Sequence, residues 1–101
     1  MKVTVNHETI KQWAQKFEGR PVIVDDEGLK REFVQLRIDF PRRAGGEQFF
    51  SDEVYKISWL QFFHMFEEMQ LAFEYEDREK IEDLSLAYRF VRRFNLENGE
   101  I

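Results

Sequence analysis

The chain has 101 residues, a net charge of −5 and no cysteine, which is the size of one ordinary domain. Its 43% hydrophobic and 35% charged residues exclude a disordered chain, and no apolar run approaches the ~20 residues of a membrane span. Without cysteine there is neither a disulfide nor thiolate chemistry. We therefore expect one cytoplasmic domain over residues 1–101, with no membrane contact and a loose tail after about residue 95.

The first predicted element is a helix over residues 7–18. Asn6 is a good N-cap, and apolar residues at helical spacing form one face: Ile10, Trp13, Ala14 and Phe17. Gly19 is expected to end the helix in the left-handed conformation. Pro21 then prevents its continuation.

Two strands follow in the sequence. Residues 22–24 are a short β-branched run, and residues 34–40 alternate between apolar and polar side chains, which predicts a strand with one buried face. The stretch between them is typical of a loop. We expect the two strands to pair as a hairpin with a long connection.

The second half of the chain begins with its least informative part, residues 47–57, where a short strand near residues 55–57 is consistent with the pattern. Ser58 and Gln61 have capping-box spacing, and the helix that they predict carries a broad apolar stripe: Trp59, Phe62, Phe63, Phe66 and Met69. A third strand is predicted over residues 71–75. Asp77 is expected to cap a last helix over residues 78–94.

These elements predict an α+β fold in the order α-β-β-α-β-α. A small, mostly antiparallel sheet of about three strands with helices on one face would bury all of the apolar stripes. The 11 Phe, 3 Tyr and 2 Trp residues supply an aromatic-rich core, because each ring can bury roughly 150–250 Å².

Several segments together resemble a family of short uncharacterised bacterial proteins. The quoted matches are HETIKQWA at 7–14, GRP at 19–21, LRIDFP at 36–41, ISWLQFFHMFE at 57–67 and LAFEYED at 71–77. Members are sometimes labelled as glucan branching enzymes. That activity is not transferred to this chain, because the β/α barrel on which such enzymes are built typically needs ~250 residues. The resemblance implies a fold and no activity.

Catalytic and metal chemistry find no support in the pattern. No nucleophile-elbow or phosphate-loop motif occurs. His64 and Glu67 have a spacing that suits two metal ligands, but a third ligand is not evident. The acidic run from Glu74 to Asp83 lacks the spacing of a calcium loop. We therefore expect no catalytic residue, no metal and no cofactor.

Two arginine groups suggest an anion site or a nucleic-acid site: Arg42 and Arg43 beside a Gly-rich loop, and Arg89, Arg92 and Arg93 on one side of the last predicted helix. The net charge of −5 argues against nucleic acid as a partner. Anion or nucleic-acid binding is therefore the alternative function.

Three apolar residues lie off the main stripes: Phe49, Phe50 and Leu60. Because a small domain has little interior, we expect them to form an adhesive patch and to cause self-association. The preferred interpretation is a non-catalytic interaction or structural module that forms a homo-oligomer, and an enzyme ranks last. The ligand, partner and role are not specified by the sequence.

Overall fold

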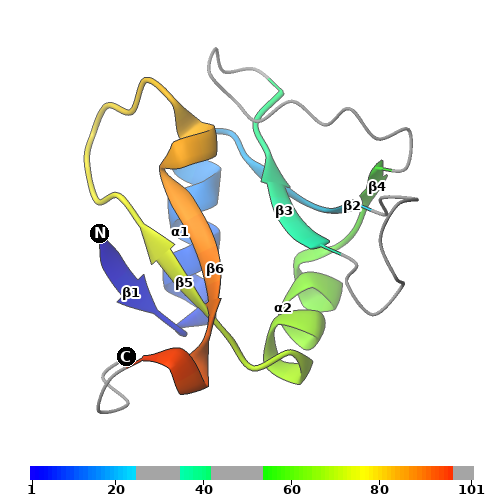
Figure 1. The fold of residues 1–101 in the computed structure, drawn as a ribbon. Helices are drawn as coiled ribbons and strands as arrows, with labels where there is room; N and C mark the ends of the chain where they lie inside the picture. The colour runs from blue at the N-terminus through cyan, green and yellow to red at the C-terminus, as the bar shows by residue number, and fades with distance from the viewer. Residues whose placement is uncertain (25–34, 42–53, 97–101) are drawn as a thin grey trace.

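A computed structural model describes residues 1–24, 35–41 and 54–96. These residues form two α-helices and two three-stranded antiparallel sheets (Figure 1). In chain order the elements are β1 (Lys2–Thr4), α1 (His7–Lys16), β2 (Arg20–Val24), β3 (Gln35–Asp39), β4 (Val54–Lys56), α2 (Trp59–Glu68), β5 (Leu71–Tyr75), the 3-10 turn η2 (Leu84–Leu86), β6 (Tyr88–Arg92) and the 3-10 turn η3 (Arg93–Asn95).

The two sheets have the strand orders β1-β5-β6 and β3-β2-β4. The α+β class of one compact domain is therefore confirmed, whereas the single sheet and the order α-β-β-α-β-α are wrong. Strand β1 is missing from the predicted order because it has only three residues. Such a segment is too short for an alternating pattern to be recognised.

The predicted hairpin is confirmed. Strands β2 and β3 pair antiparallel, from Arg20 opposite Asp39 to Val24 opposite Gln35. Strand β4 pairs with the other side of β2, close to the strand expected near residues 55–57. The side chains of Leu36 and Ile38 are buried, as the alternation predicts.

The predicted last helix is wrong. Its place is taken by a loop, the turn η2 and the strand β6, which pairs antiparallel with β5. The side chains from Tyr88 to Arg92 also alternate between the two faces of the strand, and the rings of Tyr88 and Phe90 pack on Phe73. Hydrogen bonds to β5 satisfy the backbone N–H and C=O groups that a helix would have satisfied internally. The cap is Asp83, which accepts the Ser85 N–H at 3.1 Å, while Asp77 pairs with Lys2 at 2.6 Å.

Helix α1 ends differently from the prediction. Glu18, not Gly19, has the positive φ of 61°. The N–H groups of Glu18 and Gly19 donate to the carbonyls of Gln15 and Ala14 at 3.0 and 2.8 Å, the hydrogen bonds of a Schellman motif. Gly19 is required for a different reason, because a Cβ atom there would lie 2.6 Å from the Phe40 ring and 2.7 Å from the Ile38 side chain.

Helix α2 begins as predicted. Ser58 Oγ accepts the Gln61 N–H at 3.0 Å, and Gln61 Oε1 accepts the Ser58 N–H at 2.9 Å, which completes the capping box. Its buried side, formed by Phe62, Phe63 and Phe66, faces elements of both sheets, since α2 contacts β2, β3 and β5.

Trp13 on α1 is the hub of the core. Its indole ring has edge-on or tilted contacts, at 5.4–6.1 Å between centroids, with five aromatic rings. Phe17 directly follows α1 and Phe40 directly follows β3, whereas the other three, Phe73, Tyr75 and Tyr88, belong to the β1-β5-β6 sheet. The indole N–H donates to the Glu76 carbonyl at 2.9 Å, so this ring is both packed and hydrogen-bonded. Figure 1 shows α1 behind the β1-β5-β6 sheet.

The tight packing of Gly19 predicts that Gly19→Ala lowers the free energy of unfolding by about 1–3 kcal/mol, the usual cost of overpacking a core. Denaturant unfolding of both proteins measures it. Gln15→Ala on the exposed side of α1 is the control and is expected to unfold close to wild type. An unchanged midpoint for Gly19→Ala would contradict the close approach of Phe40 and Ile38.

Candidate interaction surface

A cleft of about 230 Å³ lies between β3 and β6, and we call it the β3–β6 cleft. Its lining comes from both strands and from η2: Arg37, Ser85, Tyr88, Arg89 and Phe90. Among the described residues that line the cleft there are two guanidinium groups and no carboxylate. The Glu74 carboxylate on β5 pairs with one of these guanidinium groups, that of Arg89, and so offsets part of their positive charge.

The wall of the cleft formed by β3 is held by the hydroxyl group of Tyr88, a residue of β6. This group accepts the Ile38 N–H at 3.0 Å and donates to the Ile38 carbonyl at 3.2 Å. Ile38 lies opposite Pro21 in the β2–β3 register, and the Pro21 carbonyl faces the other way, toward the Ile57 N–H. The backbone groups of Ile38 therefore point out of the sheet edge, where Tyr88 binds both of them.

The other wall is β6, an edge strand of its sheet among the described residues. The Glu76 N–H donates to the Ala87 carbonyl, and the Arg93 N–H donates to the Gln70 carbonyl, each at 2.9 Å. Hydrogen-bonded positions alternate along an antiparallel pair. Phe90 and Arg92 are thus at the positions whose backbone N–H and C=O groups point away from β5, toward the outer edge.

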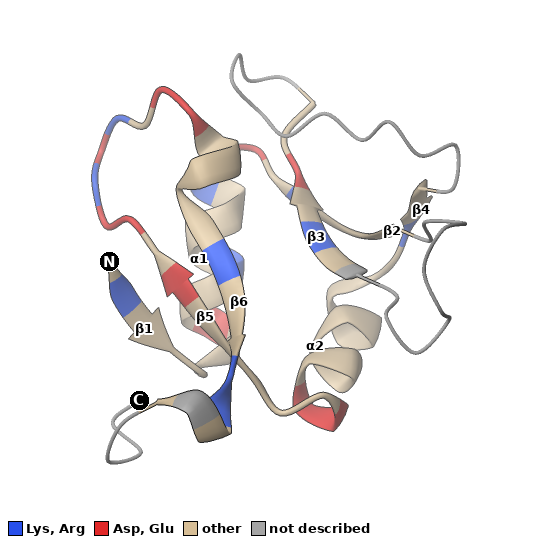
Figure 2. Ribbon diagram, in the orientation of Figure 1, with Lys and Arg blue, Asp and Glu red and all other residues tan. Residues whose placement is uncertain are grey.

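The predicted arginine group on the last helix is corrected by the strand β6. Arg89 pairs with Glu74 on the neighbouring strand, and this carboxylate raises the pKa of Arg89. Figure 2 shows a basic segment of β6 beside an acidic segment of β5. Arg92 donates to the Met69 carbonyl at 2.8 Å. Arg93 donates to the Leu71 carbonyl at 2.6 Å and to Glu67 at 2.7 Å. The three side chains are thus tied to different parts of the β5–β6 end of the molecule rather than presented together.

The remaining predicted arginines, Arg42 and Arg43, lie outside the described residues. The arginine that the structure brings beside Arg89 is Arg37, which donates to the Leu36 carbonyl at 2.9 Å. Sequence reasoning did not select it. The available signal was the alternation of residues 34–40, which places Arg37 on the polar side of its strand.

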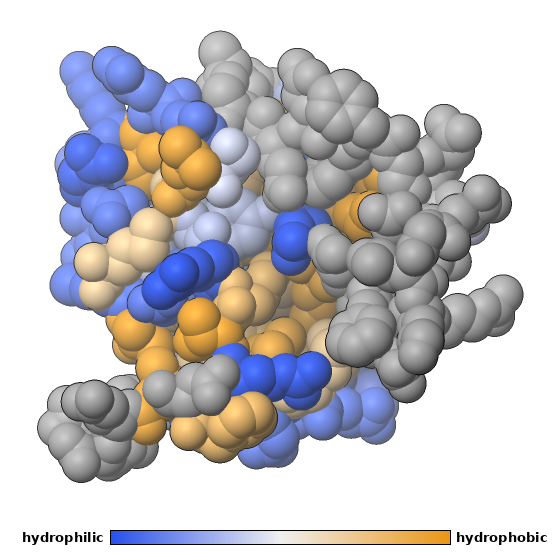
Figure 3. All heavy atoms as spheres, viewed as in Figure 1, coloured by the Kyte–Doolittle hydropathy of each residue, from blue (hydrophilic) through white to orange (hydrophobic). Residues whose placement is uncertain are grey.

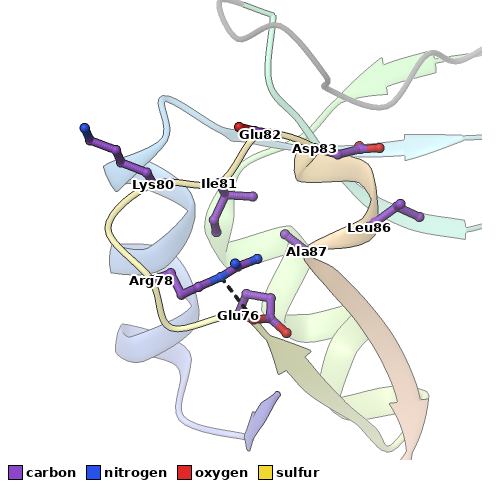
Figure 4. A pocket seen from close by; sticks show the side chains of 8 residues that line it. All are labelled: Glu76, Arg78, Lys80, Ile81, Glu82, Asp83, Leu86 and Ala87. Atoms are coloured by element: carbon purple, nitrogen blue, oxygen red, sulfur yellow. Dashed lines mark ion pairs between the residues drawn. The ribbon is translucent and has the colours of Figure 1, made fainter.

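A larger pocket, of about 540 Å³, lies under the loop that joins β5 to η2 (Figure 4). Glu76, Glu82 and Asp83 supply three carboxylates, and Arg78 and Lys80 supply two cations. In Figure 4 Arg78 extends toward Glu76, with which it forms an ion pair at 3.3 Å, whereas Lys80 points away. Its mixed charges favour no ligand class.

A third cluster joins His7, Glu67 and Arg93. Glu67 Oε2 lies 2.8 Å from His7 Nε2 and 2.7 Å from the Arg93 guanidinium, and the His7 ring stacks on Phe63 at 4.3 Å. The guanidinium and, next, the imidazole hold the pKa of Glu67 below its usual value. This network links α1, α2 and η3.

The suggested pairing of His64 with Glu67 as metal ligands does not occur, because His64 lies 3.1 Å from Glu68 instead. Across the described ranges, no cluster of three or more metal-ligating side chains is found.

The large exposed apolar side chains include Leu60 at 83%, Phe94 at 80% and Leu86 at 72%. Leu60 is as exposed as the patch prediction requires, whereas Phe49 and Phe50 lie outside the described residues. Leu86 and Phe94 stand just before and just after β6. Figure 3 shows hydrophobic and strongly hydrophilic residues side by side on the face that carries this strand.

Comparison with protein-family models, with curated proteins and with solved structures finds no match. Within the described part of the chain, neither helix has the length and apolar character needed to cross a bilayer.

The lowered pKa of Glu67 predicts a pH dependence of stability. A carboxylate with a depressed folded-state pKa stabilises the fold above its unfolded pKa, near 4.5, and this contribution is lost as the pH falls through the folded value. Glu67→Gln is therefore expected to destabilise the protein at neutral pH and to approach wild type in acid. Because Glu67 is 43% exposed, the effect is screened and modest.

Denaturant unfolding at neutral pH and well below pH 4.5 measures this difference. Glu68→Gln, at the next residue and on the helix surface, is the control. A destabilisation by Glu67→Gln that is equal at both pH values would contradict the ionic role of Glu67.

Proposed function

We propose that this chain is a non-catalytic interaction module whose binding surface is the edge and outer face of β6. The observation that carries this proposal is the setting of β6. Within the described part of the chain it is an edge strand of its sheet, and two strongly exposed apolar side chains, Leu86 and Phe94, lie just beyond its two ends. Exposed edges attract other strands, and apolar side chains beside such an edge add contact area for a protein partner.

The polar groups favour binding over catalysis. Ser58 and Ser85, the described serines, are both engaged in capping turns. His7 contacts the Glu67 carboxylate, and the further partner of Glu67 is Arg93. Because Arg93 is not a nucleophile, this group of three side chains lacks a member that nucleophilic catalysis requires. Membership of the resembled bacterial family and a cytoplasmic location belong to the same proposal.

The alternative, an anion-binding or nucleic-acid-binding protein, has a narrower basis. Arg89, Arg92 and Arg93 each have an acceptor within the chain. A nucleic-acid surface needs several cations directed at phosphates, whereas the cleft brings together two guanidinium groups. One of these two groups, the guanidinium of Arg89, is already paired with the Glu74 carboxylate.

This proposal predicts self-association of the pure protein at high concentration. Leu86→Ser combined with Phe94→Ser is expected to weaken the association, because it removes the apolar area beside β6. Leu60→Ser is the matched control: Leu60 is at least as exposed but belongs to α2, so the association is expected to persist. Light scattering over a concentration series measures both.

A monomer at every concentration would contradict the self-association. Loss of association in Leu60→Ser, with the β6 variant unchanged, would move the contact surface to Leu60, one of the three residues of the patch predicted from the sequence.

A further inference from the structure

Residues 77–82, which we call the strap, run from β5 toward the turn η2 and form one wall of the larger pocket (Figure 4). The strap is neither helix nor strand, but both of its ends are held by hydrogen bonds. Just before it, the Glu76 N–H donates to the Ala87 carbonyl, and the Glu76 carbonyl accepts the Trp13 indole N–H, each at 2.9 Å. Just after it, Asp83 caps η2.

Between these ends, two lysines supply the polar contacts of the strap with helices and strands in the described part of the chain. Lys2 on β1 lies 2.6 Å from Asp77. Lys16 on α1 lies 3.2 Å from Glu79 and donates to the Arg78 carbonyl at 3.5 Å. The strap is therefore tied to two elements, and both ties depend on the charge of a lysine.

Both ion pairs lie at the surface of the protein. The side chains of Asp77 and Glu79 are 52% and 90% exposed. The hydrogen bond from Lys2, and next its charge, lower the pKa of Asp77, so this pair favours the attached strap. Exposed pairs are weak, however, and salt screens them. The attachment of the strap therefore depends on ionic strength far more than the backbone hydrogen bonds of Glu76 do.

We infer that residues 77–82 are a salt-sensitive strap, which Lys2 and Lys16 hold against β1 and α1 at low ionic strength and which detaches locally as the salt concentration rises. The rest of the domain stays folded, because Glu76 and Asp83 remain hydrogen-bonded at the two ends. Detachment removes one wall of the pocket of about 540 Å³. The inference does not depend on the interaction function proposed above, since neither lysine belongs to β6.

Ile81 supplies the apolar part of the attachment. Its side chain is partly buried and packs against the hydrophobic core. Figure 4 shows it extending from the strap on the side of Ala87, whereas Lys80 points away. Salt screens charges but does not weaken apolar burial. The ionic and apolar contributions can therefore be separated by experiment.

Trypsin cleavage of the folded protein after Arg78 and Lys80 tests the detachment, because cleavage within a folded domain requires local opening. Mass spectrometry follows the rates at low salt and at about 1 M NaCl, where the Debye length is about 3 Å. We expect Lys2→Gln combined with Lys16→Gln to be cleaved about fivefold faster than wild type at low salt, because two exposed pairs are lost. At high salt the ratio of the two rates is expected to approach one. This ratio cancels any effect of salt on trypsin itself.

The matched control is Lys11→Gln combined with Lys56→Gln, which removes the same charge from α1 and β4. Neither of these lysines forms an ion pair with the strap, so cleavage at the wild-type rate is expected. Ile81→Ala is expected to raise the rate by the same factor at both salt concentrations. Exchange of the Trp13 indole N–H, measured by NMR in the wild type, is expected to stay equally slow, because its acceptor Glu76 remains in place.

Unfolding midpoints show whether each variant is folded, and the single changes Lys2→Gln and Lys16→Gln replace the double variant if it is not. Equal cleavage of the double variant and the wild type at low salt would overturn the inference. A difference that is the same at both salt concentrations would also overturn it. So would cleavage that begins at the same time throughout the helices and sheets, because the whole domain would then open rather than the strap.

Discussion

The architecture depends on one hydroxyl group. Tyr88 belongs to the β1-β5-β6 sheet, and Ile38 belongs to the β3-β2-β4 sheet. The Tyr88 hydroxyl satisfies both backbone groups of Ile38, which at this buried edge would otherwise lack a partner in the described structure. An unsatisfied buried backbone group costs about 1–3 kcal/mol. This pair of hydrogen bonds therefore joins the edge of one sheet to the edge of the other.

The aromatic core follows from that junction. The Tyr88 ring contacts Trp13 on α1, Phe73 on β5 and Phe40, which directly follows β3. Because interiors are close-packed, a shift of Tyr88 would be felt by all of these rings. The same junction forms one wall of the β3–β6 cleft, where Arg37 and Arg89 face a common space. Stability and the proposed binding surface thus rest on the same contact.

The sequence could predict elements whose signals are local. The Asn6 cap, the Ser58–Gln61 capping box and the alternation of residues 34–40 each act within a few residues, and the structure contains all three. It could not separate helix from strand near Tyr88, because Ile81, Leu84, Tyr88 and Val91 also match a helical spacing. Pairing with β5, a long-range interaction, decides that segment. For the same reason the proximity of Arg37 to Arg89, 52 positions apart in the printed sequence, has no local signal.

The most direct measurement is the unfolding of Tyr88→Phe. It removes only the oxygen that joins the two sheets, and we predict a loss of about 1–3 kcal/mol, since both Ile38 groups lose their partner. Tyr75→Phe, directly opposite on β5, removes the same atom from a half-buried ring and is expected to cost less. A drop of this size in the free energy of unfolding of Tyr88→Phe, together with a smaller drop for Tyr75→Phe, would support the account. Equal stability of Tyr88→Phe and wild type would contradict it.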